Sequence, residues 1–226
     1  MQNMGINNIN DNPALLRKYI EREKEAENKY YSECPDSLIP LFEKELRDMG
    51  FEFEISSQTY ALMPKYKKEL LPLAVKYYQL AKKMGKPKEQ EHFTGYFVKG
   101  CDEVLPMLLC DYYSEDTTGS LRWRISDCFY IMRSKKYVEE YLDIVSNKRF
   151  GHARRMIVLL LGKLKEESAI PILIELLEDE EVRLQAICAL GFFKRKEFRC
   201  YFERFENSNQ PAWRKYARTA LKKLDD

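Results

Sequence analysis

The sequence predicts an all-α protein in which short helical hairpins stack into a repeat array. Four segments, SLRWRISDCFYIM, HARRMIVLLLGKL, EVRLQAICALGFF and AWRKYARTALKKL, align on one arginine each, which we call the register arginines: Arg122, Arg154, Arg183 and Arg214. They are 32, 29 and 31 residues apart, a period typical of stacked repeats. Apolar residues recur three and seven positions after each arginine, which is the spacing of one helix face. Only nine glycines and nine prolines are present, too few for a turn-rich β fold.

Each register arginine is expected to lie near the start of the second helix of a hairpin, and a first helix is expected to precede it. In the clearest copy, Ser168 is expected to cap a helix through AIPILIELLED, with Pro171 in its first turn, where the missing N–H does no harm. The acidic turn EDEE follows, and the second helix is expected to begin near Glu181. A hairpin of this kind cannot bury its apolar face alone, so successive hairpins are expected to share one core.

The same pattern extends toward the N-terminus. Residues 134–146 and 196–206 are expected to supply the first helices for the hairpins of Arg154 and Arg214, and the segment LPML at 105–108 opens the one for Arg122. A long helix is expected from LLPL at 70–73 to about residue 84, paired with residues 88–99. We therefore expect a repeat array of about five hairpins over residues 65–226.

Residues 1–64 are expected to form an irregular helical cap over the open end of the array. Asn12 and Pro13 are a good helix start, and a second helix is expected from Asp36 to Met49, ended by Gly50. Residues 51–64 are expected to be an extended connector. The polar start MQNMGINNINDNP does not resemble a signal peptide, and no run approaches 18 apolar residues, so we expect a cytoplasmic protein with no membrane association.

The six cysteines contain no CxxC pair and are expected to be reduced, which argues against a zinc site. Only two histidines, His92 and His152, are present, and they belong to different repeats. Acid–base or metal chemistry therefore has few groups available, and no Gly-rich phosphate loop or G-x-S-x-G elbow is present. We expect neither a catalytic residue, nor a metal, nor a cofactor, and no small-molecule substrate is indicated.

The segment from Glu181 to Gly191, EVRLQAICALG, matches the pattern VRxxAxxALG of HEAT repeats. The chain resembles HEAT-repeat proteins over residues 102–226 and more weakly over 65–101, and among them it is similar to small bacterial ones. The resemblance implies a right-handed α-solenoid used as a recognition surface. Phycobilin lyases also carry such repeats, but no residue here specifies a bilin.

Residues one, two and five positions after the register arginines face away from the apolar stripe and vary in chemistry. Such variation over a constant core is how repeat arrays acquire a binding surface. Residues 119–226 hold 22 Lys and Arg against 16 Asp and Glu, a surplus that favours acidic partners. We expect a non-catalytic scaffold that binds a protein, an acidic one included, through the concave surface of the array, with nucleic acid as the second choice. The candidate partner-binding residues are Trp123, Arg124, Asp127, Arg155, Gln185, Lys215 and Tyr216.

One enzyme class remains as an alternative. Alkylpurine DNA glycosylases are built from HEAT-like repeats and use tryptophan, aspartate and arginine in a basic cleft. Trp123 and Asp127 lie four residues apart, on one helical face, and Arg155 follows one repeat later. An aspartate there would stabilise positive charge on a departing base. The register arginines themselves are expected to be structural, reaching acidic or carbonyl groups in neighbouring turns.

Overall fold

The computed structural model describes residues 12–225, and every regular element in that range is helical, which confirms the all-α prediction. Contacts divide the chain into two compact units, Met1–Tyr96 and Phe97–Asp226, here unit 1 and unit 2. The expectation for the polar N-terminal segment lies outside the described residues. Between residues 12 and 225 no helix has the length and apolar content to cross a membrane.

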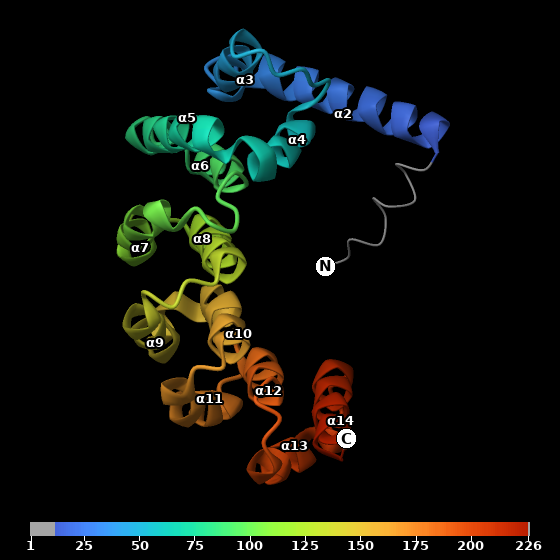
Figure 1. Ribbon diagram of the computed structural model, residues 1–226, viewed down its shortest axis with the longest axis vertical. Helices are drawn as coiled ribbons and strands as arrows, with labels where there is room; N and C mark the ends of the chain where they lie inside the picture. Colours follow the sequence, from blue (N-terminus) through green and yellow to red (C-terminus); the bar gives the residue numbers. More distant parts are fainter. Residues whose placement is uncertain (1–11, 226) are drawn as a thin grey trace. The chain divides into compact units, whose positions relative to one another are not determined.

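Unit 1 begins with a long charged helix, α2 (Pro13–Glu33). The Asn12 side chain accepts hydrogen bonds from the backbone N–H groups of Ala14, at 3.1 Å, and Leu15, at 3.3 Å. These bonds satisfy two of the donors that a helix start leaves open, as the Asn-Pro pair predicts. The remaining elements are α3 (Ile39–Asp48), α4 (Ser56–Thr59), η1 (Tyr60–Leu62), α5 (Met63–Lys83) and α6 (Pro87–Thr94) (Figure 1).

An aromatic cluster forms the core of unit 1. The fully buried Phe42 ring of α3 lies 5.3 Å from the rings of Tyr77 and Phe93 and 4.9 Å from the ring of Tyr96. Residues from the expected cap and from the expected first hairpin therefore share one core. The compact units divide after Tyr96 rather than at residue 64. The assignment of residues 65–96 to the repeat array stays a prediction.

The expectation of an extended connector at residues 51–64 is wrong, because this stretch contains α4 and η1. The backbone N–H of Ser56 donates to Glu27 Oε1 at 2.8 Å, and the Thr59 hydroxyl lies 2.5 Å from that of Tyr96. Both partners belong to distant parts of the unit. Tertiary contacts thus outweigh the short alternating pattern of the segment.

Unit 2 is a series of hairpins whose helices form two rows (Figure 1). The second helices α8 (Gly119–Met132), α10 (Arg155–Leu164), α12 (Arg183–Gly191) and α14 (Pro211–Asp225) pack against one another in succession. The first helices α7 (Leu105–Tyr113), α9 (Val138–Ser146), α11 (Ile170–Glu175) and α13 (Arg199–Glu206) form the other row. Short 3₁₀ turns complete the hairpins: η2 (Asp102–Val104), η3 (Lys148–Arg154), η4 (Glu167–Ala169), η5 (Leu176–Glu178) and η6 (Lys196–Phe198). The right-handedness of the array stays a prediction.

Two helix starts differ from the expectation. Ser168 lies in η4 and does not cap α11; instead, the Glu166 side chain accepts from the Ser168 backbone N–H at 3.4 Å. The helix expected near Glu181 begins at Arg183. Asp179 Oδ1 accepts a hydrogen bond from the backbone N–H of Glu181 at 3.1 Å, which holds Glu181 in the turn before the helix.

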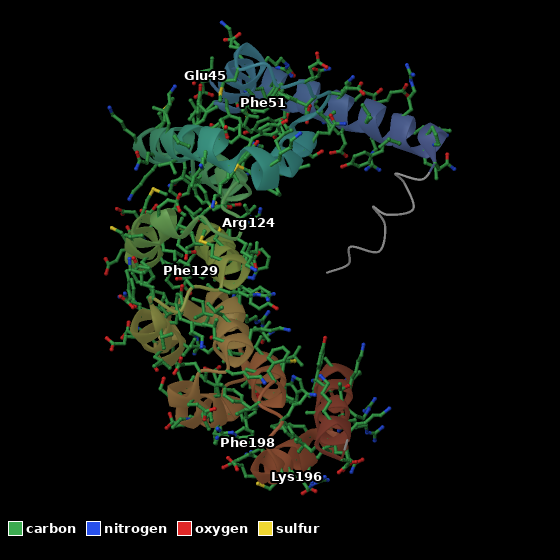
Figure 2. The ribbon with its side chains drawn as sticks, viewed as in Figure 1. Glu45, Phe51, Arg124, Phe129, Lys196 and Phe198 are labelled. Atoms are coloured by element: carbon green, nitrogen blue, oxygen red, sulfur yellow. The ribbon has the colours of Figure 1, made fainter. Side chains whose placement is uncertain are left out.

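The apolar stripe of the second helices is the core of unit 2. Ile125, Phe129, Ile157 and Leu161 are fully buried, and Figure 2 places Phe129 in the interior between the rows. At Gly162 the helices α10 and α12 approach closely, since a Cβ atom there would lie 2.5 Å from the Cα of Ala189.

Candidate partner-binding surface

The register arginines cap the first helix of their own hairpin. Arg122 donates from Nε to the carbonyl of Tyr112 at 2.9 Å and from Nη2 to that of Ser114 at 2.8 Å, and Arg183 Nε donates to the carbonyl of Leu177 at 2.6 Å. In the last hairpin, the same bond runs from Arg214 to Ser208. The last carbonyls of a helix have no partner within it, so each guanidinium satisfies them and joins the two helices. These arginines are structural.

Arg154 differs because it also reaches the next repeat. Its side chain is fully buried, and Nη1 donates to the Val145 carbonyl at 3.1 Å. Nη2 donates to Asp179 Oδ2 at 2.8 Å and to Glu181 Oε2 at 3.2 Å. Burial alone would raise the pKa of Asp179, but hydrogen bonds from Arg154 and from the Glu181 backbone hold it below its ordinary value. One guanidinium therefore connects two hairpins.

Three predicted site residues lie on α8, where Figure 2 shows Arg124. The Trp123 side chain is 37% exposed. Arg124 Nη1 lies 3.9 Å from Asp127 Oδ2, one helical turn away. Burial raises the pKa of the Asp127 carboxyl, and Arg124 opposes that rise. The exposed aromatic ring thus lies beside a pair of charges that neutralise each other.

Arg155 begins α10 and is exposed, yet its Nε donates to the Glu181 carbonyl at 2.7 Å. Like the bonds of Arg154, this bond connects the start of α10 with the turn before α12. It leaves the terminal nitrogens of the Arg155 guanidinium for other contacts. Gln185 is half-buried on α12. Both residues belong to the row of second helices.

Lys215 and Tyr216 lie on α14, where Tyr216 is 42% exposed and the Lys215 ammonium lies 5.9 Å from its ring. Tyr216 also lines a small apolar cavity of about 110 Å³ between α12 and α14, together with Cys188 and Phe192. Burial raises the pKa of the Cys188 thiol to about 12, which makes it a packing residue rather than a nucleophile.

The structure brings the seven predicted residues onto one row of helices, but in two groups. The first comprises Trp123, Arg124, Asp127 and Arg155 on α8 and α10, which pack together, and the second comprises Gln185, Lys215 and Tyr216 on α12 and α14. Among the described side chains, no hydrogen bond or ion pair joins the two groups. The predicted residues therefore lie along an extended row of packed helices.

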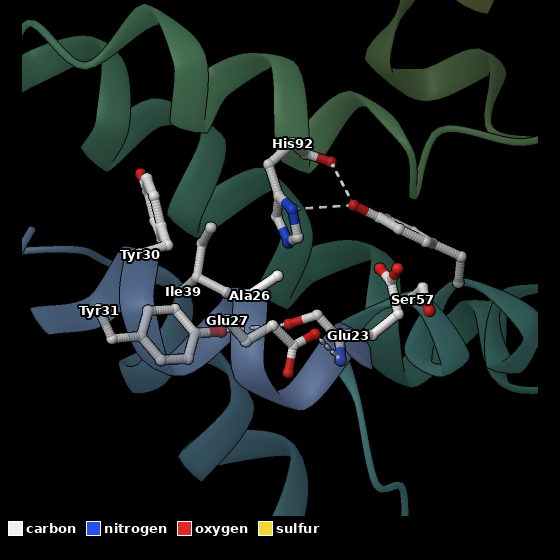
Figure 3. Close-up of a pocket in the computed structure, with 10 residues that line it drawn as sticks. Glu23, Ala26, Glu27, Tyr30, Tyr31, Ile39, Ser57 and His92 are labelled. Carbon is white, nitrogen blue, oxygen red and sulfur yellow. Dashed lines mark hydrogen bonds between the residues drawn. The ribbon is translucent and has the colours of Figure 1, made fainter. Parts of the chain in front are cut away.

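A cavity in unit 1 was missed by the sequence reasoning, since its lining comes from four helices and a 3₁₀ turn and forms no motif (Figure 3). It measures about 310 Å³, and no Lys or Arg lines it. Burial raises the pKa of Glu27, and the negative charges of Glu43 and Glu23 raise it further. The hydrogen bond from the Ser56 backbone lowers it, but by less. The lining residues are Glu23, Ala26, Glu27, Tyr30, Tyr31, Ile39, Ser56, Ser57, Tyr60 and His92.

Polar groups of this cavity are used by the packing of α2 against the rest of unit 1. Tyr31 donates to the buried carboxylate of Glu43 at 3.1 Å, and the Tyr60 hydroxyl lies 2.9 Å from His92 Nδ1. These bonds hold the helices together around the cavity. In the part of the chain that the structure describes, no three His, Cys, Asp or Glu side chains converge as metal ligands.

Comparison with known proteins supports the repeat architecture. Residues 153–179 match the family model described as PBS lyase HEAT-like repeat. The matched segment runs through α10 and α11 and ends at Asp179, so it contains both partners of the Arg154–Asp179 ion pair. No curated protein matches the chain. Within residues 153–179 the chain is therefore similar to a HEAT-like repeat, which agrees with the helical hairpins of unit 2.

Proposed function

We propose that the protein is a non-catalytic, cytoplasmic scaffold that binds another protein through the row α8–α10–α12–α14. A HEAT-like repeat supports a helical repeat scaffold, and such repeats commonly mediate protein interactions. The six cysteines are unpaired with one another, which supports a reducing compartment. The observation that carries the proposal is the exposure of the large side chains of Trp123, Ile131 and Tyr216 on a row whose apolar stripe is buried.

Aromatic side chains supply much of the binding energy at protein interfaces, because each buries a large apolar area with few rotatable bonds. Trp123 and Tyr216 lie on helices held rigidly by the shared core, so little ordering accompanies binding. Lys215, next to Tyr216, adds positive charge, which favours an acidic surface on the partner. A folded partner would therefore contact an aromatic side chain at each end of the row.

The glycosylase alternative is less well supported by this geometry. A carboxylate that stabilises positive charge in a transition state has to be ionised and free to face the substrate. Asp127 instead lies beside Arg124, and burial raises its pKa. Trp213, the other tryptophan, is half-buried and packs edge-on against Phe205 and under the Arg183 guanidinium, so these contacts already occupy its ring.

The test is affinity capture from the native cell, followed by calorimetry with the captured protein. In the Trp123→Ala, Tyr216→Ala variant, the binding free energy is expected to be less favourable by about 2 kcal/mol or more, which raises the Kd about 30-fold. Thermal stability should change little. The matched control replaces Leu41 and Met84, two exposed apolar residues of unit 1, by alanine and should bind like the wild type. Equal binding by both variants would contradict the proposal.

A further inference from the structure

Three second helices of unit 2 end at, or just before, a basic residue in the left-handed backbone conformation. These residues are Arg133 (φ 54°), Lys165 (φ 51°) and Lys194 (φ 55°), and in the described range no other residue except glycine has a positive φ. Each lies eleven positions after its register arginine, and each is exposed. The same conformation therefore recurs at the same place in three successive repeats.

This choice of residue is unusual. The left-handed conformation costs a residue with a Cβ about 1–2 kcal/mol, and glycine is the usual solution after a helix. In the same chain Gly50 and Gly85 take that position after α3 and α5, with φ of 89° and 66°. The attraction of a cation to the helix C-terminus recovers only about 0.3–1 kcal/mol. Strained residues that persist in this way point to a role for the side chain itself.

These three residues lie on an edge of unit 2 that is rich in positive charge. We define the inter-repeat edge as residues 133–137, 163–168 and 192–198, which connect each hairpin to the next. It holds eight Lys and Arg against three Glu. The opposite edge, residues 114–118, 147–153 and 178–182, holds two Lys and Arg against six Asp and Glu. Positive charge is thus sorted to one side of the repeats.

The segments of this edge are neighbours in space. Lys163 Nζ lies 4.1 Å from the centre of the Phe192 ring in the next segment, and Arg195 forms an ion pair with Glu167. Lys135 and Lys136 line a groove of about 660 Å³ whose other polar residues are Glu139, Glu140, Glu166 and Ser168. The three segments are therefore neighbours along one edge, and the glutamates among them are fewer than the lysines and arginines.

Most of these basic side chains are not neutralised by the protein. Within residues 12–225 only Arg195 of the eight forms ion pairs, with Glu167 and Glu197. The other seven are exposed, as Lys196 is beside the buried Phe198 in Figure 2. On the opposite edge, in contrast, acidic residues pair with Arg154 and Arg183. The seven are Arg133, Lys135, Lys136, Lys163, Lys165, Lys194 and Lys196.

We propose that the inter-repeat edge binds the phosphate backbone of a nucleic acid. Its positive charge is dense and made mostly of lysines, which interact with phosphates as point charges and need no fixed geometry. A protein partner needs aromatic or apolar anchors, and the exposed ones of unit 2 include Trp123 and Tyr216, outside this edge. Adjacent packed helices lie about 8–10 Å apart, so the charges recur at short steps along a strand.

The test uses the full chain and measures fluorescence anisotropy of labelled duplex DNA and of labelled single-stranded RNA between about 50 and 200 mM salt. In the variant Arg133→Gly, Lys165→Gly, Lys194→Gly, the log–log salt slope on duplex DNA should be smaller by about 2.7, at about 0.9 per phosphate contact. The loss of affinity over this salt range should then be about 40-fold smaller than for the wild type. The same variant should unfold at a higher denaturant concentration, because glycine relieves the strain. Weaker binding by a more stable protein cannot result from misfolding.

The matched control replaces three exposed lysines of unit 1, Lys18, Lys44 and Lys68, by glutamine and removes the same charge. It should keep the wild-type slope. No salt-dependent binding by the wild type, or an unchanged slope in the glycine variant, would overturn the inference. Binding to polyglutamate without binding to either nucleic acid would also overturn it and assign the edge to acidic proteins. The inference goes beyond the proposed function. The Trp123→Ala, Tyr216→Ala variant should keep the wild-type salt slope of nucleic-acid binding, so either the inference or the proposed function can fail without the other.

Discussion

Arg154 and Asp179 form an ion pair across two repeats, with Nη2 of the arginine 2.8 Å from Oδ2 of the aspartate. The arginine side chain is fully buried, and that of the aspartate is 10% exposed. The guanidinium therefore has no solvent to replace a lost partner. Loss of the arginine is costly, because the nearly buried Asp179 carboxylate would be left without its cation.

The first prediction concerns this pair. Arg154→Met keeps an extended side chain but leaves Asp179 without its cation, and we expect it to lower the free energy of unfolding by about 3–5 kcal/mol. The pKa of Asp179 is lowered in the folded state, so its contribution is present at neutral pH and is lost as the pH falls through the folded-state value. Urea unfolding of wild type and Asp179→Asn should differ at pH 7, and the difference should shrink as the pH falls below the ordinary aspartate pKa of about 3.9. A difference that persists in acid would contradict this assignment.

A second prediction concerns the close contact of α10 with α12. Gly162→Ala would place a methyl group 2.5 Å from the Ala189 Cα, so we expect overpacking to cost about 1–3 kcal/mol. Gly119→Ala is the control, because nothing lies within 4 Å of its Cβ position at the start of α8. Alanine should be neutral there or stabilise the helix by up to about 1 kcal/mol. Chemical denaturation of the two variants measures the contrast, and equal effects would show that the two helices are not in tight contact.

The third prediction addresses catalysis. The purified protein should release no alkylated purine from damaged duplex DNA, because Asp127 is held beside Arg124 and is partly buried. Chromatography of the released bases provides the measurement, and Asp127→Asn is the matched variant. Release by the wild type that is lost in Asp127→Asn would replace the scaffold proposal with a repair enzyme.

Cysteine reactivity gives the fourth prediction. At pH 8 the Cys188 thiol, with a pKa raised by burial to about 12, should be almost entirely protonated and react slowly with iodoacetamide. Cys110 and Cys200 are exposed and should be alkylated first. Peptide mass spectrometry over time distinguishes the sites. Cys188 labelled as fast as Cys200 would mean that the joint between α12 and α14 opens readily.

The period of the register arginines and the apolar stripe were enough to predict the hairpins of unit 2, since both depend on local spacing. The Asn12 cap was predictable for the same reason. The helix at Ser56–Thr59 was not, because its bonds to Glu27 and Tyr96 come from residues distant in sequence.

The candidate surface was predictable only as positions on a helix face. Spacing indicates which way Trp123 or Tyr216 points, but not that the predicted residues separate into two groups on neighbouring helices. The basic residues eleven positions after three of the register arginines were not singled out from the sequence. Their conformation was not predictable, because lysine and arginine do not favour it.

The capping role of the register arginines bears on how the length of such a chain can change. Within its own hairpin, each of three register arginines bonds to carbonyls at the end of the preceding helix, so these bonds depend on no other hairpin. The three are Arg122, Arg183 and Arg214. Duplication or deletion of such a module would preserve those bonds. Arg154 also depends on Asp179 in the following module, and the two central hairpins would therefore have to be inherited together.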